Sequence, residues 1–235
     1  VLDEPPADLD HGPFAALVTF LAAGPPPVAV GWGSMRLERM SSMDVLLLLL
    51  KALKRAERRA VIIGGWARFD LLAQRLIEGS DPERDDDELG GKERAEELSE
   101  LATFARDECC FVEEVPHTWL FPQCSCIVHH GGAGTTHAAV RAGRPSVVTP
   151  VWIDQFWWAS TVSRLRIGVG FQQLLPRLAN PVLRLADAIE RAERLSANTE
   201  TLGARLRSED GAGCAARILH NFLHGVVGPG RWKDS

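Results

Sequence analysis

The stretch from His129 to Thr136 constrains the fold more than any other part of the chain. It carries three glycines within four residues, so its backbone can make turns and close approaches that side chains would block. An apolar run at 126–128 precedes it and a helical pattern at 137–142 follows it. We therefore expect a strand, a glycine-rich turn and a helix N-terminus. The free N–H groups and the dipole of such a helix end favour an anion, here a phosphate or diphosphate.

Side chains of the same stretch add further hydrogen-bond donors. Thr135 and Thr136 offer hydroxyl groups, and His129 or His130 can offer a charge-assisted donor. Neighbouring residues of a strand point to opposite sides, so only one histidine can face the phosphates, and the two cannot chelate one metal. We expect His129 to face the phosphates, with simple packing as the alternative, and His130 to stabilise the loop.

Short apolar runs typical of buried strands recur along the middle of the chain. They lie at residues 28–32, 60–64, 110–115, 125–128, 146–149 and 169–171. Helical patterns separate them, one of which covers residues 69–77. Residues 181–223 are mostly helical, with breaks expected near Asn198 and Gly211. This alternation predicts an α/β fold: a Rossmann-like, parallel six-stranded sheet with helices on both faces and a helical C-terminal tail.

The carboxyl ends of the strands of such a sheet form the edge at which ligands bind. Several polar or aromatic residues fall at or near the ends of the predicted strands: Ser34, Trp66, His117, His129 and Asp154. We therefore expect one ligand site along this edge. Ser42 or Asp44 is expected to cap the helix that follows the first strand.

The chain length fits one large domain, which we place at residues 14–224. Residues 1–13 are acidic and contain prolines, as a linker does, and residues 225–235 form a tail. Residues 79–99 contain an acidic run and a glycine pair. We expect a disordered surface insertion there, with a cation site as the alternative, and a return to helix over residues 92–106.

Charge and cysteine content exclude further classes of protein. The net charge of -5 excludes general nucleic-acid binding, which needs a basic face. The five cysteines include no CxxC pair and no spaced framework, so we expect reduced thiols, no metal and a cytoplasmic location. Residues 1–13 show no signal-peptide pattern, and the apolar run at 45–50 is too short to span a bilayer.

Residues 129–155, with the sequence HHGGAGTTHAAVRAGRPSVVTPVWIDQ, resemble the donor-binding signature of family 1 glycosyltransferases, the UDP-dependent enzymes of the GT-B fold. Three further segments agree in order and spacing: PPPVAVGWGSM at 25–35, GGW at 64–66 and VPHTWLFPQ at 115–123. Within the family the chain looks most like sterol 3-beta-glucosyltransferases and related bacterial antibiotic glycosyltransferases. The resemblance covers about residues 14–195 and implies the C-terminal, donor-binding half of a GT-B enzyme.

The resemblance also implies roles for residues along the predicted edge. His129 would bind the donor diphosphate and stabilise the charge that grows on the leaving UDP, without a metal. Asp154 and Gln155 would bind sugar hydroxyls, because a carboxylate and an amide together offer acceptors and donors. His137 stands where many relatives place a ribose-binding glutamate, so no carboxylate is carried over to that position.

The base and ribose would be lined by His117 and by the backbone of Val115, and Ser34 would lie near the phosphates and the sugar. The implied donor-binding set is Ser34, Val115, His117, His129, Gly131, Gly132, Ala133, Gly134, Thr135, Thr136, Asp154 and Gln155.

Several of these residues also have purely structural interpretations. Ser34 could be a turn hydroxyl, His117 could cap the following turn, and Asp154 could cap the helix that begins at Gln155. Trp66 and Trp119 could be core residues or pocket walls, with packing favoured for Trp119.

The resemblance predicts a UDP-dependent hexosyltransferase donor domain, with UDP-glucose as donor and inverting transfer to a hydroxyl of a lipophilic acceptor such as a sterol. This would place the protein in carbohydrate and lipid metabolism. In the family, the general base and the acceptor site belong to an N-terminal domain, through which peripheral membrane association would also arise. The alternatives are a non-catalytic nucleotide-sugar-binding module or subunit that needs a partner, a transferase for another small aglycone, and a UDP-sugar epimerase of similar fold. The HHGGAGTT signature speaks against the epimerase.

Overall fold

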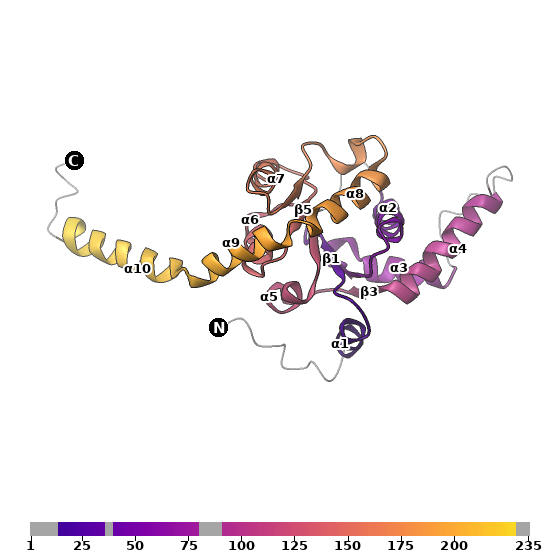
Figure 1. The fold of residues 1–235 in the computed structure, drawn as a ribbon, viewed down its shortest axis with the longest axis horizontal. Helices are drawn as coiled ribbons and strands as arrows, with labels where there is room; N and C mark the ends of the chain where they lie inside the picture. Colours follow the sequence, from indigo (N-terminus) through magenta and orange to yellow (C-terminus); the bar gives the residue numbers. More distant parts are fainter. Residues whose placement is uncertain (1–13, 36–39, 80–90, 229–235) are drawn as a thin grey trace.

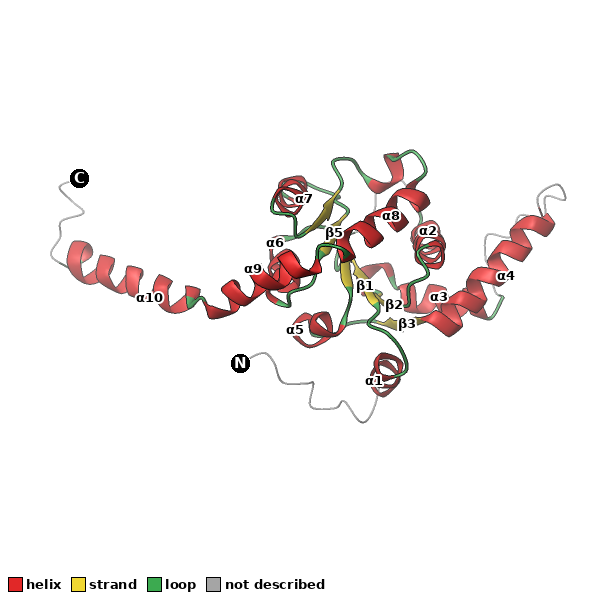
Figure 2. Cartoon of the chain, in the orientation of Figure 1, coloured by secondary structure: helices red, strands yellow, loops and turns green. Residues whose placement is uncertain are grey.

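The computed structural model describes residues 14–35, 40–79 and 91–228, which form a six-stranded parallel sheet between two layers of helices (Figure 1; Figure 2). The strands are β1 (Val28–Gly31), β2 (Ala60–Ile63), β3 (Cys109–Val112), β4 (Cys126–His129), β5 (Ser146–Val148) and β6 (Gly168–Gly170). Their order in the sheet is β3-β2-β1-β4-β5-β6. The predicted α/β class and the six parallel strands are confirmed.

Helices cover both faces of this sheet, as expected. One face packs against α2 (Ser42–Arg55), α3 (Phe69–Ile77), α4 (Gly91–Glu108) and α8 (Pro181–Glu193). The other face packs against α1 (Ala15–Ala22), α5 (His117–Leu120), α6 (Ala133–Arg141) and α7 (Gln155–Arg164), and α9 (Ser196–Ser208) lies on α6. The short turns η1 (Gly65–Ala67), η2 (Phe121–Gln123) and η3 (Leu175–Arg177) lie between these elements. The C-terminal helix α10 (Gly211–Phe222) and the π-helical turn η4 (Leu223–Val227) extend away from the sheet (Figure 1).

Alternation along the strands decides which side chains face which helices. Val30 and Val128 pack in the cluster that contains α2 and α8, whereas Ala29 and Ile127 pack in the cluster that contains α1 and α5. Because both faces are covered, the strands are apolar runs rather than alternating ones. His129 follows Ile127 by two residues, so its side chain points to the side of α5 and α6.

The strand order reverses between β1 and β4. From β1 the chain first builds outward through β2 and β3, and then returns to β4 on the other side of β1. Gly31 at the end of β1 pairs with His129 at the end of β4. In open α/β sheets this switch point leaves a crevice at the carboxyl ends of the strands, where ligands bind.

Two boundaries differ from the sequence-based expectation. Ser41, rather than Ser42 or Asp44, caps α2: the Ser41 hydroxyl accepts the Asp44 N–H at 3.1 Å, and the Asp44 carboxylate accepts the Ser41 N–H at 3.3 Å. This capping box contributes about 1 kcal/mol to helix stability. The break expected near Asn198 lies at residues 194–195, because α8 ends at Glu193 and α9 begins at Ser196.

The expected disordered segment at 79–99 is wrong for residues 91–99, which form the first half of α4, whereas the helix expected over 92–106 is confirmed. Packing and charge explain the helix. Leu101 and Ala105 lie in the core, and Glu97 and Glu100 pair with lysines of α2 at 2.8 and 2.6 Å. Residues 80–90 of that segment, the expected linker 1–13 and residues 229–235 of the expected tail lie outside the described residues.

Candidate functional site

Helix α6 begins at the turn after β4 without a side-chain cap. Gly132 occupies the N-cap position in an extended conformation with ψ 142°, and the first turn carries no acidic residue. The first N–H groups of a helix have no intrahelical partner, and they carry the positive end of the helix dipole. The turn predicted to bind an anion therefore offers its donors at the crevice between β1 and β4.

Two glycines of this turn differ in the space around them. Gly131 has φ +92°, and a Cβ there would come within 2.6 Å of Cγ1 of Val148 and 3.2 Å of the backbone oxygen of Gln155. The turn is thus packed directly against the end of β5 and the start of α7. A Cβ on Gly134 would meet no atom within 4 Å, which leaves open space beside the first turn of α6.

His129 presents a neutral imidazole donor at this point. Its side chain is 1% exposed, and its Nδ1 accepts the Gly131 N–H at 3.0 Å. This bond places the imidazole hydrogen on Nε2, which is buried and has no hydrogen-bond partner among the described residues. Burial, followed by the nearby His130 and His117, lowers the pKa of His129 to about 3. The desolvated site therefore favours the neutral ring, whose Nε2–H can still donate a charge-assisted hydrogen bond to an ionised phosphate.

Acidification is expected to destabilise the fold through His129. The pKa of histidine in an unfolded chain is about 6.5, so below this value the unfolded state binds more protons and stability is lost as pH falls. Between about pH 7 and pH 5.5, wild type should lose about 1 kcal/mol more unfolding free energy than His129→Asn. Urea denaturation at both pH values measures this difference. His137→Asn, at an exposed position of α6, should keep the wild-type loss, and equal losses in wild type and His129→Asn would contradict the assignment.

A small cavity joins His129 to other predicted site residues. It has a volume of about 50 Å³ and is lined by residues that include Gly31, Gly33, His117, His129, His130 and Thr135. Pockets for drug-sized ligands enclose roughly 300–1,000 Å³. The cavity therefore forms only the inner end of a site that lies open along the sheet edge.

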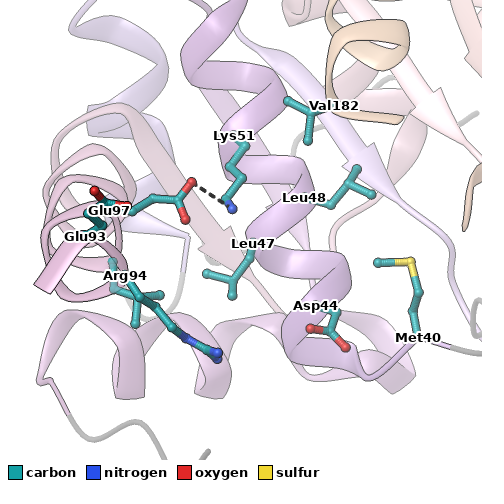
Figure 3. A pocket seen from close by; sticks show the side chains of 10 residues that line it. Met40, Asp44, Leu47, Leu48, Lys51, Glu93, Arg94, Glu97 and Val182 are labelled. Carbon is teal, nitrogen blue, oxygen red and sulfur yellow. Dashed lines mark ion pairs between the residues drawn. The ribbon is translucent and has the colours of Figure 1, made fainter. Parts of the chain in front are cut away.

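A larger hollow lies elsewhere among the described residues. It has a volume of about 810 Å³ and lies between α2, α4 and Val182 of α8 (Figure 3). The Lys51–Glu97 ion pair of 2.8 Å crosses it. It contains none of the predicted site residues, so we locate the candidate site from chemistry and topology rather than from size.

His130 and Thr136 serve the turn itself. A Cβ on Gly132 would come within 2.5 Å of Nε2 of His130, so this ring lies over the turn, as expected for a loop-stabilising residue. The pKa of His130 is lowered, because burial outweighs the opposite effect of the nearby Asp154. The Thr136 side chain is buried, and its hydroxyl donates to the Gly132 carbonyl at 2.9 Å. The hydroxyl of Thr136 is thus committed inside α6, while Thr135 lines the cavity.

His117 is the first residue of α5, which contacts α6, and it stacks on Phe121 with ring centroids 4.4 Å apart. Burial lowers its pKa. Pro116 occupies the N-cap position of α5, and no side chain caps that helix end, so the capping alternative for His117 is wrong. The Val115 side chain is buried in the core, which leaves its backbone as the group available to a ligand.

Ser34 is exposed in the turn that follows β1. Gly33 has φ +59°, and its carbonyl accepts the Trp66 N–H at 3.2 Å, which joins the ends of β1 and β2. The Trp66 side chain is 68% exposed, so it is not a core residue. Trp119 is half-buried and packs against the cluster under α1 and α5, which confirms the packing interpretation.

Asp154 and Gln155 lie side by side at the start of α7 but differ in environment. Asp154 is exposed, and its Oδ2 accepts Nε1–H of Trp158 at 3.2 Å. It occupies the N-cap position without a side-chain cap bond, so the capping interpretation of its carboxylate is wrong. Gln155 is 7% exposed, and its Oε1 accepts the N–H groups of Val151 and Trp152 at 2.8 and 2.9 Å.

A buried polar network under the site was not predicted. Nε1 of Trp32 donates to Oγ1 of Thr149 at 2.9 Å, and the Thr149 hydroxyl donates to the His129 carbonyl at 3.3 Å. The Thr149 N–H also donates to this carbonyl, at 2.9 Å. The network ties the end of β4 to the residues that follow β1 and β5. Trp32 and Thr149 stand 117 positions apart, so no local pattern could have shown their contact.

All five cysteines carry free thiols, and burial raises the pKa of Cys110 to about 11 and that of Cys124 to about 12. Within residues 14–35, 40–79 and 91–228, no group of three His, Cys, Asp or Glu side chains is placed to hold a metal ion. In the same ranges, no helix combines the length and the apolar character needed to cross a bilayer.

Comparison with known proteins finds a matching family and several relatives. The family described as erythromycin biosynthesis protein CIII-like, C-terminal domain, matches residues 92–215. A sterol 3-beta-glucosyltransferase of Arabidopsis thaliana is 31% identical over 216 residues, which cover 91% of the chain and 29% of that protein. Vancomycin aglycone glucosyltransferase of Amycolatopsis orientalis is 32% identical over 203 residues, covering 86% of the chain and 40% of that protein.

Solved structures agree on the fold. The glycotransferase of kitacinnamycin superposes with a TM-score of 0.57 at 22% identity, over 85% of this chain and 44% of that one. Spinosyn rhamnosyltransferase gives a TM-score of 0.57 at 21% identity, over 84% and 45%. The chain therefore spans less than half the length of each of these relatives, and its fold is that of the C-terminal half of a GT-B glycosyltransferase.

Proposed function

Because this chain belongs to the family of erythromycin biosynthesis protein CIII-like C-terminal domains, we propose that it binds the UDP-sugar donor, with UDP-glucose expected, for a glycosyltransferase. One observation carries the proposal. The buried Nε2–H of His129 has no partner among the described residues, and it lies at the switch point beside the uncapped N-terminus of α6. A buried unpaired donor is costly, and a diphosphate oxygen would satisfy it.

The donor would lie along the sheet edge. Its diphosphate takes the His129 donor, the first N–H groups of α6 and the Thr135 hydroxyl, in the open space left by Gly134. Its uracil and ribose lie toward His117 and the backbone of Val115, with Ser34 near the phosphates. Its sugar extends toward Asp154, whose exposed carboxylate accepts hydrogen bonds from sugar hydroxyls.

This placement suits departure of UDP. As the acceptor hydroxyl attacks the anomeric carbon with inversion, the bond to the diphosphate breaks and negative charge grows on UDP. The His129 donor and the helix N-terminus then stabilise the leaving group. The general base and the acceptor-binding residues are assigned to an N-terminal domain of a longer protein.

Two sterol relatives matched by this chain cover 91% of its length, at 31% and 29% identity. On this ground we propose a lipophilic acceptor such as a sterol, in lipid metabolism, with peripheral membrane contact through the N-terminal region. Another small aglycone is the second candidate, because the vancomycin enzyme matches at 32% identity. A non-catalytic nucleotide-sugar-binding subunit remains the alternative from another class. The five free thiols support a cytoplasmic location.

A donor screen by thermal shift and calorimetry tests the proposed function. UDP, UDP-glucose, UDP-glucuronate and a TDP-sugar are compared at equal concentrations. UDP and UDP-glucose are expected to raise the melting temperature, because a ligand that binds only the folded state stabilises it. If none of these nucleotides bound, the proposed donor site would be wrong.

The Asp154→Ala variant separates the sugar from the nucleotide in the same screen. It is expected to keep UDP affinity and to lose about 5- to 30-fold in UDP-glucose affinity, as for a charged hydrogen bond. Asp187→Ala on α8, away from the predicted edge, is the matched control and should bind both ligands as wild type does. Equal losses for UDP and UDP-glucose in Asp154→Ala would contradict a sugar-specific role.

A further inference from the structure

We infer that Gln155 is a positioning residue, which holds the loop Val151–Asp154 in a strained conformation and thereby sets Asp154 for the donor sugar. The inference rests on the proposed donor site and concerns how its sugar end is built. It differs from the role implied by resemblance, in which the Gln155 amide itself binds the sugar.

Gln155 restrains the loop Val151–Asp154 through hydrogen bonds of both its side chain and its backbone. Its Oε1 accepts the Val151 N–H at 2.8 Å and the Trp152 N–H at 2.9 Å. Its own backbone N–H donates to the Trp152 carbonyl at 3.1 Å. The carbonyl oxygen of the side chain is therefore occupied twice, and the side chain is 7% exposed.

The loop needs such a restraint because Ile153 is strained. This β-branched residue has φ +40°, in the left-handed region that such side chains rarely adopt. Its side chain is 71% exposed, so core packing does not hold it in place. Strain of this kind persists only where the surroundings over-determine it, and it clusters at functional sites. The three hydrogen bonds from Gln155 supply that restraint.

The restrained loop delivers Asp154 at a defined place. Asp154 directly follows Ile153 and is held from the other side by the Trp158 indole at 3.2 Å. Gln155 also lies against Gly131, since a Cβ on Gly131 would come within 3.2 Å of the Gln155 backbone oxygen. The loop that would meet the sugar and the turn that would meet the diphosphate are thus fixed against each other.

Two substitutions separate the positioning role from direct contact. Gln155→Glu keeps an oxygen that can accept both loop N–H groups, and its charge is favoured in the first turn of α7, but it has no amide N–H for a sugar. Gln155→Leu has similar bulk and no acceptor. A positioning residue tolerates the first change, whereas a sugar hydroxyl that accepts from the amide N–H loses its donor in both variants.

The test is calorimetry of the full chain with UDP and with UDP-glucose. In Gln155→Leu, UDP affinity is expected to stay within about threefold of wild type while UDP-glucose affinity falls at least tenfold. Gln155→Glu should bind UDP-glucose within about threefold of wild type. Adding Ile153→Gly to Gln155→Leu should restore part of the lost affinity, because glycine adopts positive φ without strain. Gln173→Leu, at an exposed position, is the matched control.

Three results would overturn the inference. They are wild-type UDP-glucose affinity in Gln155→Leu, equal losses in Gln155→Glu and Gln155→Leu, and no recovery in the double variant. Rescue by Gln155→Glu also separates positioning from loss of folding, which thermal melts of all variants monitor. A wild-type chain that binds neither ligand would instead overturn the donor site itself, so the two failures are distinct.

Discussion

The free energy of unfolding of the Gly131→Ala variant is expected to be about 2–4 kcal/mol lower than that of wild type. Gly131 has φ +92°, where an L side chain is strained, and the added Cβ would lie 2.6 Å from Cγ1 of Val148. Neither contact is with the end of a flexible side chain, because Val148 is a buried β-branched residue and the second contact, at 3.2 Å, is the backbone oxygen of Gln155. Urea denaturation with a linear extrapolation measures the loss.

Gly134→Ala is the matched control for this prediction. Gly134 lies three residues further along, within α6, and its added Cβ would meet no atom within 4 Å. The control is expected to be as stable as wild type or more stable by up to about 1 kcal/mol, because alanine is favoured in helices. Equal stability of the two alanine variants would show that the turn does not need glycine at position 131.

The His129→Ala variant is expected to bind UDP about 10- to 150-fold more weakly than wild type. This corresponds to about 1.5–3 kcal/mol, the contribution of a hydrogen bond to a charged group. The change removes the Nε2–H donor that has no partner among the described residues. It also removes the Nδ1 acceptor of the Gly131 N–H, so the turn loses part of its support as well. Titration calorimetry with UDP measures the affinity.

A matched control separates donor loss from a general effect of histidine removal. His137 lies in α6 and is exposed, so His137→Ala should bind UDP within about twofold of wild type. Circular dichroism and thermal melts establish that His129→Ala is folded at the assay temperature. A folded His129→Ala variant with unchanged UDP affinity would remove His129 from the diphosphate site.

Much of the fold followed from local patterns. The apolar runs predicted all six strands, because strands buried on both faces are short and continuously apolar. The helix at Phe69–Ile77 was predicted at its observed bounds. Helix α4 was expected over residues 92–106, but residues 91–99 were also assigned to a disordered insertion, because the ion pairs of Glu97 and Glu100 with Lys51 and Lys54 come from another element.

Local patterns predicted part of the candidate site but not all of it. The glycine turn and the strand pattern were enough to place His129 at the end of a strand, at the sheet edge. Local patterns did not show that the Thr136 hydroxyl is occupied, because its donation to the Gly132 carbonyl depends on the helix geometry. The neutral state of His129 also escaped prediction, since it follows from burial.

The sequence by itself therefore determined the class of the fold, and it is enough to propose the edge for a ligand and an anion-binding role for the turn after β4. These properties rest on side-chain periodicity and glycine chemistry, which act over a few residues. Only the tertiary structure decided that Gln155 holds the loop before it, that Thr149 joins Trp32 to the His129 carbonyl, and that His129 is uncharged. Burial and hydrogen bonds between distant residues exist only once the sheet and its helices are packed together.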